Sequence, residues 1–422
     1  AKGFSISAEP LIVTLNKHIF LVRQQLKNLQ GEASIICEPM SRNTCPAITA
    51  AALNVEQADE DTFMLVLPSD QFIGSEDTLK EAANAGLPLA TAGKLVTFGV
   101  KPETAHTGFG YIRTGEPFLK GFCVDEFTEK PEKSLAEFYV ESGKYLWNSG
   151  IFLFSAKLLL EKVSELAPEI FSHVKKAFNN SGQGDRVILL NEEDYRNCPN
   201  DSIDCAVMEK AKDIAVIPMA LKWNDIGSWE SLGDMVKKDQ LGNSTQGDVF
   251  LKDSEKSFIR AESRMVAATG LKNMLVVETP DVVMVAPKDK SQEIRELASD
   301  LEKLGREELS RPKVVNRPWG TYESIATGEN YQVKRIIVYP EQSLSLQQHK
   351  HRSEHWTVVV GTGVVDLNDS TFELSANEST YIAAGSKHRL SNKTQDILEI
   401  IEVQTGSYLG EDDIIRYEDS YG

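Results

Sequence analysis

The chain has 422 residues, 41% of them hydrophobic, and a formal net charge of −18 at pH 7. This length allows two or three domains with cores of their own, and the acidity argues against nucleic acid as a partner, because binding to a phosphate backbone draws on a surplus of lysine and arginine. With no apolar run of about 18 residues and no charged-then-apolar leader, we expect a cytoplasmic protein with no membrane partner.

Short apolar runs alternate with helical patterns over residues 1–241. Such runs, rich in β-forming residues and without polar alternation, are typical of buried parallel strands. They are residues 11–14, 63–67, 96–100, 151–154 and 214–217. Apolar residues recur at helical spacing between them, as in residues 19–29 and 47–55. The alternation predicts a doubly wound α/β domain over this region.

The pattern changes at residue 242 to short β-like pieces separated by Gly, Asn, Asp and Ser. An amphipathic helix follows, with one apolar stripe formed by Ile294, Leu297, Leu301 and Leu304. The charged, non-periodic stretch that follows at residues 306–313 indicates a linker. We therefore expect residues 242–313 to form a small β appendage with a helix and a linker.

Residues 314–422 contain strand-like runs and no helical pattern. The runs, at residues 332–338, 356–367, 380–383 and 397–403, are broken by proline and glycine at the intervals of a small barrel or jelly roll. The sequence therefore predicts an all-β C-terminal domain.

Four of the seven histidines lie in this last region, at His349, His351, His355 and His388. His349 and His351 are two residues apart, so on a strand both imidazoles project from one face. A carboxylate and the later His388 would complete a shell of three histidines and one glutamate that suits a divalent transition metal. We prefer Glu354 as the carboxylate, with the adjacent His355 as the rival ligand. The alternative is that His349 and His351 are solvent-exposed side chains on a strand and do not bind a metal.

These residues resemble a cupin, in which an HxH pair is followed by a nearby Glu, a Gly seven residues later and a distant His. Glu354, Gly361 and His388 fit this pattern, although Glu354 lies only three residues after His351, one short of the usual gap. The wider sequence is similar to the type II phosphomannose isomerase domain over nearly all of residues 314–422. The motifs that carry this resemblance are 317–322 (RPWGTY), 333–336 (VKRI), 344–356 (LSLQQHKHRSEHW), 379–382 (STYI), 388–390 (HRL), 402–404 (EVQ) and 408–414 (YLGEDDI).

The resemblance implies interconversion of mannose 6-phosphate and fructose 6-phosphate. This reaction removes a proton next to a carbonyl, which a bound metal assists by polarising the sugar oxygens. We expect Zn²⁺, although His and Glu ligands also admit Mn, Co, Ni and Fe. Arg389 is a candidate catalytic residue, and Lys334, Arg335 and Arg416 are candidates for binding the phosphate or the enediolate. The alternative for each cation is a surface charge pair, and the base remains open.

Two aspartates stand out in the N-terminal region. Asp70 follows the apolar run 63–67, at the end of a strand where ligands of open α/β sheets collect. Asp225 lies in the glycine-containing turn at 223–229 (WNDIGSW). Together they could hold Mg²⁺ for the attack of a sugar phosphate on the α-phosphorus of a nucleoside triphosphate. Each aspartate alone is more often a turn former or a helix cap.

The segments around these aspartates resemble the mannose-1-phosphate guanylyltransferases, in the order found in that family. They are 38–44 (EPMSRNT), 67–70 (LPSD), 107–113 (TGFGYIR), 127–131 (FTEKP), 145–150 (YLWNSG), 202–210 (SIDCAVMEK) and the turn that holds Asp225. The resemblance implies that GTP and mannose 1-phosphate yield GDP-mannose and diphosphate.

By this resemblance Asp70 and Asp225 would coordinate the metal as catalytic residues, and Lys130 would hold the sugar phosphate and act in catalysis. The residues implied to contact mannose are Gly110, Glu129 and Asn148. The nucleotide would meet the N-terminus of a helix, where amide donors favour anions, at Arg42, Asn43 and Thr44.

One departure from the family concerns its opening strand and glycine-rich loop, for which we find no counterpart. If the 422 residues are the whole molecule, we expect isomerisation with little nucleotidyl transfer; if they are a fragment, we expect the intact protein to do both. The alternatives are a protein with one active half and a silent nucleotide-sugar binding protein. The expected partners are GTP, mannose 1-phosphate, GDP-mannose and mannose 6-phosphate, and homo-oligomerisation is left open.

Overall fold

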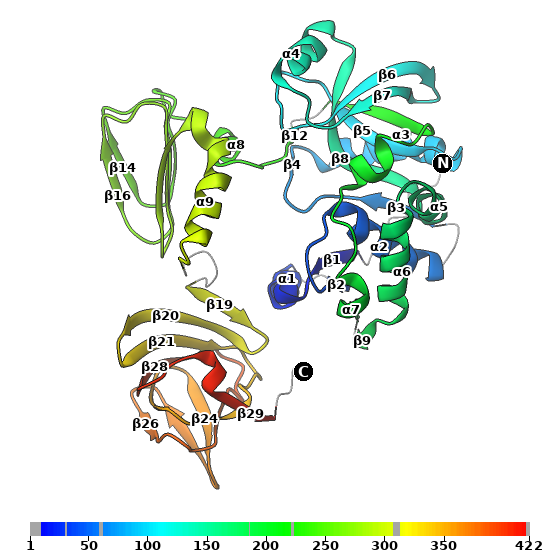
Figure 1. Ribbon diagram of the computed structural model, residues 1–422. Coiled ribbons are helices and arrows are strands. Elements are labelled where there is room, and N and C mark those ends of the chain that lie inside the picture. Colours follow the sequence, from blue (N-terminus) through cyan, green and yellow to red (C-terminus); the bar gives the residue numbers. More distant parts are fainter. Residues whose placement is uncertain are drawn as a thin grey trace. The chain divides into compact units, whose positions relative to one another are not determined.

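The computed structural model describes residues 10–418 except 30–31, 59–61, 185, 221–222 and 307–312. The chain divides into two compact units, Ala1–Gly227 and Ser228–Gly422 (Figure 1). This boundary precedes helix α8 (Trp229–Met235), which packs on the strands of the appendage: the hydroxyl of Ser244 donates to the carbonyl of Gly233 at 2.9 Å. The division into 1–241, 242–313 and 314–422 stays a prediction.

The first unit contains a small sheet and a large sheet. The small sheet has the order β1-β2-β10-β9, in which β1 and β10 run parallel to β2. Its strands are β1 (Leu11–Leu15), β2 (Ser34–Glu38), β9 (Gly182–Gly184) and β10 (Val187–Leu189). The large sheet has the order β3-β8-β5-β11-β7-β6. Its strands are β3 (Phe63–Val66), β5 (Leu95–Val100), β6 (Tyr111–Phe118), β7 (Gly121–Thr128), β8 (Tyr145–Ser155) and β11 (Ile214–Met219).

The large sheet is mixed rather than parallel. Strands β5 and β11 run parallel, as the apolar runs predict, but β8 runs antiparallel to β3, β5 and β6. The expectation that residues 151–154 form a parallel strand was therefore wrong. An apolar run without alternation indicates burial of both faces, which does not fix strand direction.

Both faces of the large sheet are buried under helices. In β8, Phe152 and Phe154 join one core cluster, while Ile151 and Leu153 join the other, as the alternation of side chains along a strand requires. Helices α2, α5 and α6 pack in the first cluster and α3 packs against β5, β8 and β11 in the second. The helices of this unit are α1 (Ile19–Asn28), α2 (Thr44–Ala58), α3 (Glu76–Thr91), α4 (Lys133–Ser142), α5 (Ala156–Leu166), α6 (Pro168–Asn179) and α7 (Glu192–Tyr195).

The appendage at the start of the second unit is a parallel coil. Alternate strands enter different sheets, so that β13, β15 and β17 run parallel in one sheet and β14 and β16 in another. Its strands are β13 (Ser244–Gln246), β14 (Val249–Lys252), β15 (Phe258–Ala261), β16 (Val266–Thr269), β17 (Met274–Glu278) and β18 (Val283–Pro287). Helix α9 (Ile294–Lys303) follows them (Figure 1), as the apolar stripe predicts.

The C-terminal part of the second unit consists of two β-sheets, in agreement with the predicted barrel. One sheet has the order β19-β20-β21-β28-β23-β26 and the other β25-β24-β27-β22-β29. The strands are β19 (Val314–Arg317), β20 (Gly320–Gly328), β21 (Tyr331–Val338), β22 (Leu346–His349), β23 (Arg352–Val360), β24 (Thr362–Leu367), β25 (Ser370–Ser375), β26 (Ser379–Ile382), β27 (His388–Ser391), β28 (Leu398–Gly406) and β29 (Ile414–Glu418). Inward side chains of both sheets form one core, which includes Trp356, Val365 and Ile400.

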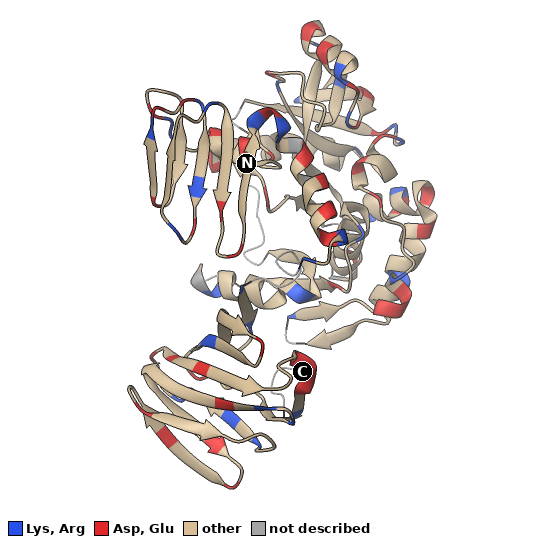
Figure 2. Ribbon diagram, turned by 60° about the vertical axis from the view of Figure 1, so that its left-hand side comes forward, with Lys and Arg blue, Asp and Glu red and all other residues tan. Residues whose placement is uncertain are grey.

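Charged side chains are spread over the helices and strands of both units, and acidic residues mark many of the helices in the first unit (Figure 2). None of the helices in the described part of the chain is both long enough and apolar enough to cross a bilayer.

Candidate active sites

Three buried side chains meet inside the C-terminal barrel. His349 ends β22, Glu354 lies on β23 and His388 begins β27, and one ligand atom from each lies within 4.8 Å of the others. The Nε2 atom of His349 lies 3.0 Å from Oε1 of Glu354, and Nε2 of His388 lies 3.5 Å from Oε2 of the same carboxylate. Two imidazoles and a carboxylate at this spacing can share one cation.

The hydrogen bonds of this group leave ligand atoms available for a metal. Neither ring nitrogen of His349 has a hydrogen-bond partner among the described residues, although both are buried. His388 bonds the carbonyl of Ser386 through Nδ1 at 3.0 Å, which leaves Nε2 facing Glu354. Burial lowers the pKa of His388, and the neutral imidazole is the form that binds a metal. An orphaned buried imidazole beside a carboxylate fits a bound cation.

Charges around Glu354 keep this carboxyl ionised. Burial alone would raise its pKa, but the adjacent imidazoles of His349 and His388 and the charge of Arg352 hold it well below its usual range. An ionised carboxylate is the form that ligates a metal.

The structure does not bring His351 into this group. Strand β22 ends at His349, so His351 lies in the turn before β23, and the parity that would place both imidazoles on one face does not apply. The His351 side chain is exposed, with its ring edge-on to Tyr408 at 6.3 Å between centroids. His355 is also exposed and lies against Tyr381.

Gln347 is a polar neighbour of the group that the sequence reading did not count among the ligands. It lies two residues before His349 on β22, and its Nε2 atom is 3.5 Å from Nε2 of His388. The spacing of Gln347 and His349 could have indicated this position, because residues two apart on a strand share a face.

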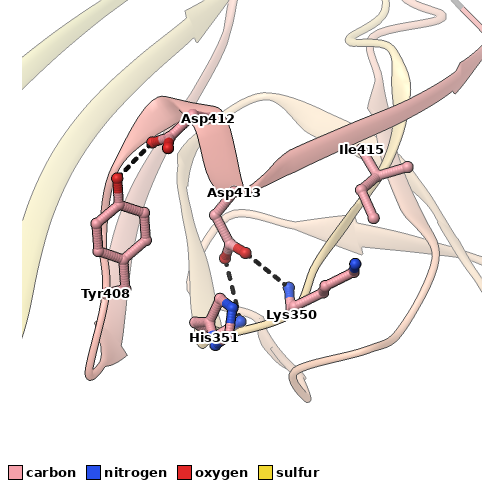
Figure 3. Close-up of a pocket in the computed structure, with 6 residues that line it drawn as sticks. All are labelled: Lys350, His351, Tyr408, Asp412, Asp413 and Ile415. Atoms are coloured by element: carbon pink, nitrogen blue, oxygen red, sulfur yellow. Dashed lines mark hydrogen bonds between the residues drawn. The ribbon is translucent and has the colours of Figure 1, made fainter.

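A surface cavity of about 460 Å³ adjoins the turn that holds His351 (Figure 3). It is lined by Lys350, His351, Tyr408, Asp412, Asp413 and Ile415. The carboxylate of Asp413 accepts hydrogen bonds from the backbone N–H groups of Lys350 at 3.2 Å and His351 at 3.1 Å. These bonds fix the turn, and with it the position of His349 at the end of β22.

A polar network surrounds the buried carboxylate. The indole N–H of Trp356 donates to Oε2 of Glu354 and to Oε1 of Glu402, both at 3.0 Å. The side-chain amide of Gln404 donates to Glu354 at 3.1 Å and to Glu402 at 2.8 Å. Burial and the negative charge of Glu354 raise the pKa of Glu402 to about 8. A second carboxyl group, protonated at neutral pH, thus lies beside the candidate ligands.

The sequence reading also missed Glu402 and Gln404 as site residues. Every second residue of β28 from Leu398 to Gln404 is buried, so both side chains occupy positions in phase with the core. A charged residue at such a position is a signal of a functional site, because an unpaired carboxylate is costly to bury.

Two of the four predicted cationic side chains face away from the group of His349, Glu354 and His388. Arg335 forms a two-pronged contact with Glu399 at 2.8 and 2.9 Å, and Arg389 binds Asp366 and Glu418, both at 2.9 Å. Arg389 directly follows His388 on β27, and neighbouring residues of a strand face opposite sides of the sheet. This placement does not match the expected roles of Arg389 as a catalytic residue and of Arg335 as a residue that binds the phosphate or the enediolate.

The other two cations differ in exposure, since Lys334 is buried and Arg416 is exposed. Lys334 is buried, binds Glu411 at 2.7 Å and lies 4.9 Å above the ring of Tyr322. Arg416 lies directly opposite Gln347 in the pairing of β22 with β29, and cross-strand partners point to the same face. Both remain candidates for binding a sugar phosphate.

In the first unit, a short ladder places Asp70 and Asp225 at the same end. Strand β12 (Trp223–Asn224) pairs antiparallel with β4 (Phe72–Ile73), with Asn224 opposite Phe72. Asp225 follows this pair on one strand and Asp70 precedes it on the other. Gln71 ties the ladder to β8, since it accepts from the indole N–H of Trp223 at 2.9 Å and donates to the carbonyl of Ser149 at 2.7 Å.

The three residues expected to contact mannose are brought together. Asn148 donates through its backbone N–H to the carbonyl of Gly110 at 2.8 Å. A Cβ atom on Gly110 would lie only 2.5 Å from Oε2 of Glu129 and 3.2 Å from Cβ of Asn148. Burial and the charge of Asp204 raise the pKa of Glu129 to about 7. Lys130 is exposed, with Nζ 3.4 Å from Oε1 of Glu129.

Two further acids adjoin this cluster and were not among the expected site residues. Oδ1 of Asp204 accepts a hydrogen bond from Nδ2 of Asn148 at 2.7 Å, and Oε1 of Glu209 accepts the backbone N–H of Glu129 at 2.8 Å. Both acids belong to the segment 202–210. They contact Asn148 and Glu129, which are distant in the sequence, so the local pattern does not reveal that they lie at the site.

The predicted nucleotide-binding residues precede and begin helix α2. The side chain of Arg42 donates to the carbonyl of Arg196, and the hydroxyl of Thr44 accepts the backbone N–H of Ile203 at 2.9 Å. Asn43 adopts a left-handed backbone conformation, with φ of 68°, and its side chain accepts the N–H of Thr44 at 2.9 Å. In this arrangement Arg42 and Thr44 tie the helix start to neighbouring segments.

Three family models match consecutive parts of the chain. They are a nucleotidyl transferase model over residues 5–241, a MannoseP isomerase/GMP-like beta-helix domain model over residues 247–301 and a mannose-6-phosphate isomerase C-terminal model over residues 304–419. The first model alone covers more than half of the chain.

Related proteins match almost the whole chain. The xanthan biosynthesis protein XanB of Xanthomonas campestris pv. campestris is 44% identical over 98% of this chain and 88% of its own length. The mannose-1-phosphate guanylyltransferase of Escherichia coli K12 is 42% identical over the same shares. A solved mannose-1-phosphate geranyltransferase from Thermus thermophilus shares the fold at a TM-score of 0.59 and 24% identity, over 70% of this chain and 100% of its own. The chain belongs to the family of mannose-1-phosphate guanylyltransferases that carry a C-terminal mannose-6-phosphate isomerase domain.

Proposed function

We propose that this protein supplies GDP-mannose through two reactions on one chain. The C-terminal domain interconverts fructose 6-phosphate and mannose 6-phosphate, and the first unit converts GTP and mannose 1-phosphate into GDP-mannose and diphosphate. We place both reactions in the cytoplasm. The observation that carries the isomerase half is the buried group of His349, Glu354 and His388. Family membership over nearly the whole chain supports the transferase half.

For the isomerase, we propose that His349, Glu354 and His388 hold a divalent transition metal, with Zn²⁺ as the expected ion. The side-chain oxygen of Gln347, whose amide lies beside His388, would be the fourth ligand in place of His351. A metal bound there would polarise the sugar oxygens and stabilise negative charge on them. Lys334, which is buried on β21, and Arg416, which lies opposite Gln347 on β29, would bind the substrate's phosphate.

For the transferase, we propose that Asp70 and Asp225 hold Mg²⁺, because carboxylate oxygens are the ligands this ion prefers. Bound Mg²⁺ would neutralise charge on the triphosphate. Gly110, Glu129 and Asn148 would bind the mannose, and Lys130 would pair with its phosphate. Arg42, Asn43 and Thr44 would orient the nucleotide at the start of α2.

Both activities should be measured on one preparation of the full chain. Asp225→Asn should lower GDP-mannose formation by about a hundredfold or more and leave isomerisation unchanged, since loss of a metal ligand removes stabilisation of the transition state. Glu354→Ala should give the reverse pattern. Two activities that fall together in both variants would contradict the assignment of separate sites.

A further inference from the structure

Asp204 lies at the start of a single π-helical turn, η2 (Asp204–Met208), in which its carbonyl accepts the N–H of Glu209 at 2.8 Å. We propose that Asp204 is a positioning residue for sugar-phosphate binding, which fixes the orientation of the Asn148 side-chain amide. This inference rests on the guanylyltransferase function proposed above. It concerns a residue that acts through Asn148 rather than one that touches the reacting atoms.

The hydrogen bonds of Asn148 define which end of its amide is which. Oδ1 accepts from the hydroxyl of Thr97 at 2.9 Å and from the backbone N–H of Gly150 at 3.3 Å, while Nδ2 donates to Asp204 at 2.7 Å. The hydroxyl of Thr97 can donate or accept, so it does not select an orientation. A backbone N–H can only donate, so Gly150 requires Oδ1 on its side, and the carboxyl oxygen of Asp204 then accepts from Nδ2; Gly150 and Asp204 set the orientation together.

One N–H of Nδ2 remains for a ligand once Asp204 has taken the other. Asn148 lies beside Gly110, and the missing Cβ of this glycine leaves room next to both the amide and the carboxyl of Glu129. A sugar hydroxyl can accept a hydrogen bond from an amide and donate one to a carboxylate. If Oδ1 and Nδ2 of Asn148 exchanged places, the side chain would present an oxygen to the same hydroxyl and could no longer donate a hydrogen bond to it.

The segment that carries Asp204 is anchored on both sides. Its start binds the first turn of α2, since Cys45 donates to the carbonyl of Asp201 at 3.2 Å and Ile203 donates to the hydroxyl of Thr44 at 2.9 Å. Its end holds the backbone of Glu129 through Glu209. Asp204 is thus fixed independently of Asn148, as a positioning residue must be. Single π-turns of this kind are frequent at functional sites.

Initial-rate kinetics on the full chain test the proposal. Asp204→Ala should raise the KM for mannose 1-phosphate by about tenfold or more, the effect of leaving the Asn148 amide without its buried hydrogen-bond partner, and leave the KM for GTP within about twofold. The same substitution in an Asn148→Ala background should change the KM by less than about twofold, because its effect passes through Asn148. Asp204→Asn should recover most of the loss, since its amide oxygen can still accept.

Ser202→Ala is the matched control. The Ser202 hydroxyl accepts the N–H of Cys205 at 3.2 Å in the same turn and does not touch Asn148, so this variant should keep the KM for mannose 1-phosphate. Additive effects of Asp204→Ala and Asn148→Ala, or an equal rise in both KM values, would overturn the proposal. An inactive wild type would refute only the guanylyltransferase function. Calorimetric titration with mannose 1-phosphate would then decide: weaker binding by Asp204→Ala supports the proposal, and equal affinity overturns it.

Discussion

His349 and Glu354 meet across a tight turn, with Nε2 of the imidazole 3.0 Å from Oε1 of the carboxylate. The imidazole has no hydrogen bond at either nitrogen among the described residues, and the carboxylate contacts His388 on its other oxygen. Glu354 therefore lies between two imidazoles, and the predictions for the isomerase follow from this position.

Removal of the Glu354 carboxylate should abolish isomerase activity together with metal binding. In Glu354→Ala we expect activity to fall by about a thousandfold, because the cation loses the single charged ligand of the group. Metal content of the purified protein, measured by plasma mass spectrometry, should fall in parallel. His355→Ala is the neighbouring control, since this side chain is exposed, and it should keep both metal and activity. A Glu354→Ala protein with full metal content would refute the ligand assignment.

The fourth ligand can be identified by comparing Gln347→Ala with His351→Ala. Gln347 lies near His388, whereas His351 is exposed beside Tyr408. We expect Gln347→Ala to weaken metal affinity by about tenfold or more and His351→Ala to leave it within about twofold. Competition with a chromogenic chelator gives both affinities. The opposite order would restore the ligand set expected from the HxH pair.

Much of the fold could be predicted because burial leaves a clear periodic signal. The apolar runs at residues 96–100 and 214–217 lie in the adjacent parallel strands β5 and β11, as expected. The direction of β8 could not be read, because a strand buried on both faces shows the same composition whether it runs parallel or antiparallel. Direction depends on chain connections that the local pattern does not contain.

The sites were predictable to a different extent. Spacing on one strand suffices to place Gln347 and His349 on the same face. Whether His351 joins them depends on where β22 ends. The strand ends before a turn whose backbone N–H groups donate to Asp413, a contact that is distant in the sequence. Asp204 could not be linked to Asn148 from the sequence. The two residues meet only because η2 packs beside β8, and no local periodicity encodes that contact.

The ionisation of Glu129 should make the first unit less stable as pH rises. Burial and the charge of Asp204 raise its pKa from 4.5 to about 7. The folded state therefore holds a proton that the unfolded chain releases between pH 4.5 and 7, so stability falls over this window and stays level above it. Glu129→Gln lacks this dependence, and at pH 8 it should exceed wild type by on the order of 1–3 kcal/mol.

Thermal unfolding of both proteins at pH 4.5 and pH 8 measures this difference. The Tm values should coincide at the lower pH and separate at the higher one. Glu137→Gln, an exposed substitution on α4, is the matched control and should follow wild type at both values. A Glu129→Gln protein that is less stable than wild type at pH 8 would show that the ionised carboxylate is stabilised by its neighbours.

A methyl group at position 110 should damage sugar binding without unfolding the protein. In Gly110→Ala the new Cβ would lie 2.5 Å from Oε2 of Glu129, so that carboxyl must move from its place beside Asn148. We expect the KM for mannose 1-phosphate to rise by about tenfold, with the KM for GTP and the isomerase activity unchanged. Gly115→Ala provides the control on β6, because the nearest atoms to its Cβ would belong to the side chain of Asp125, which is exposed and can rotate away. If both substitutions raised the KM equally, the effect would arise from the strand rather than from the position of Glu129.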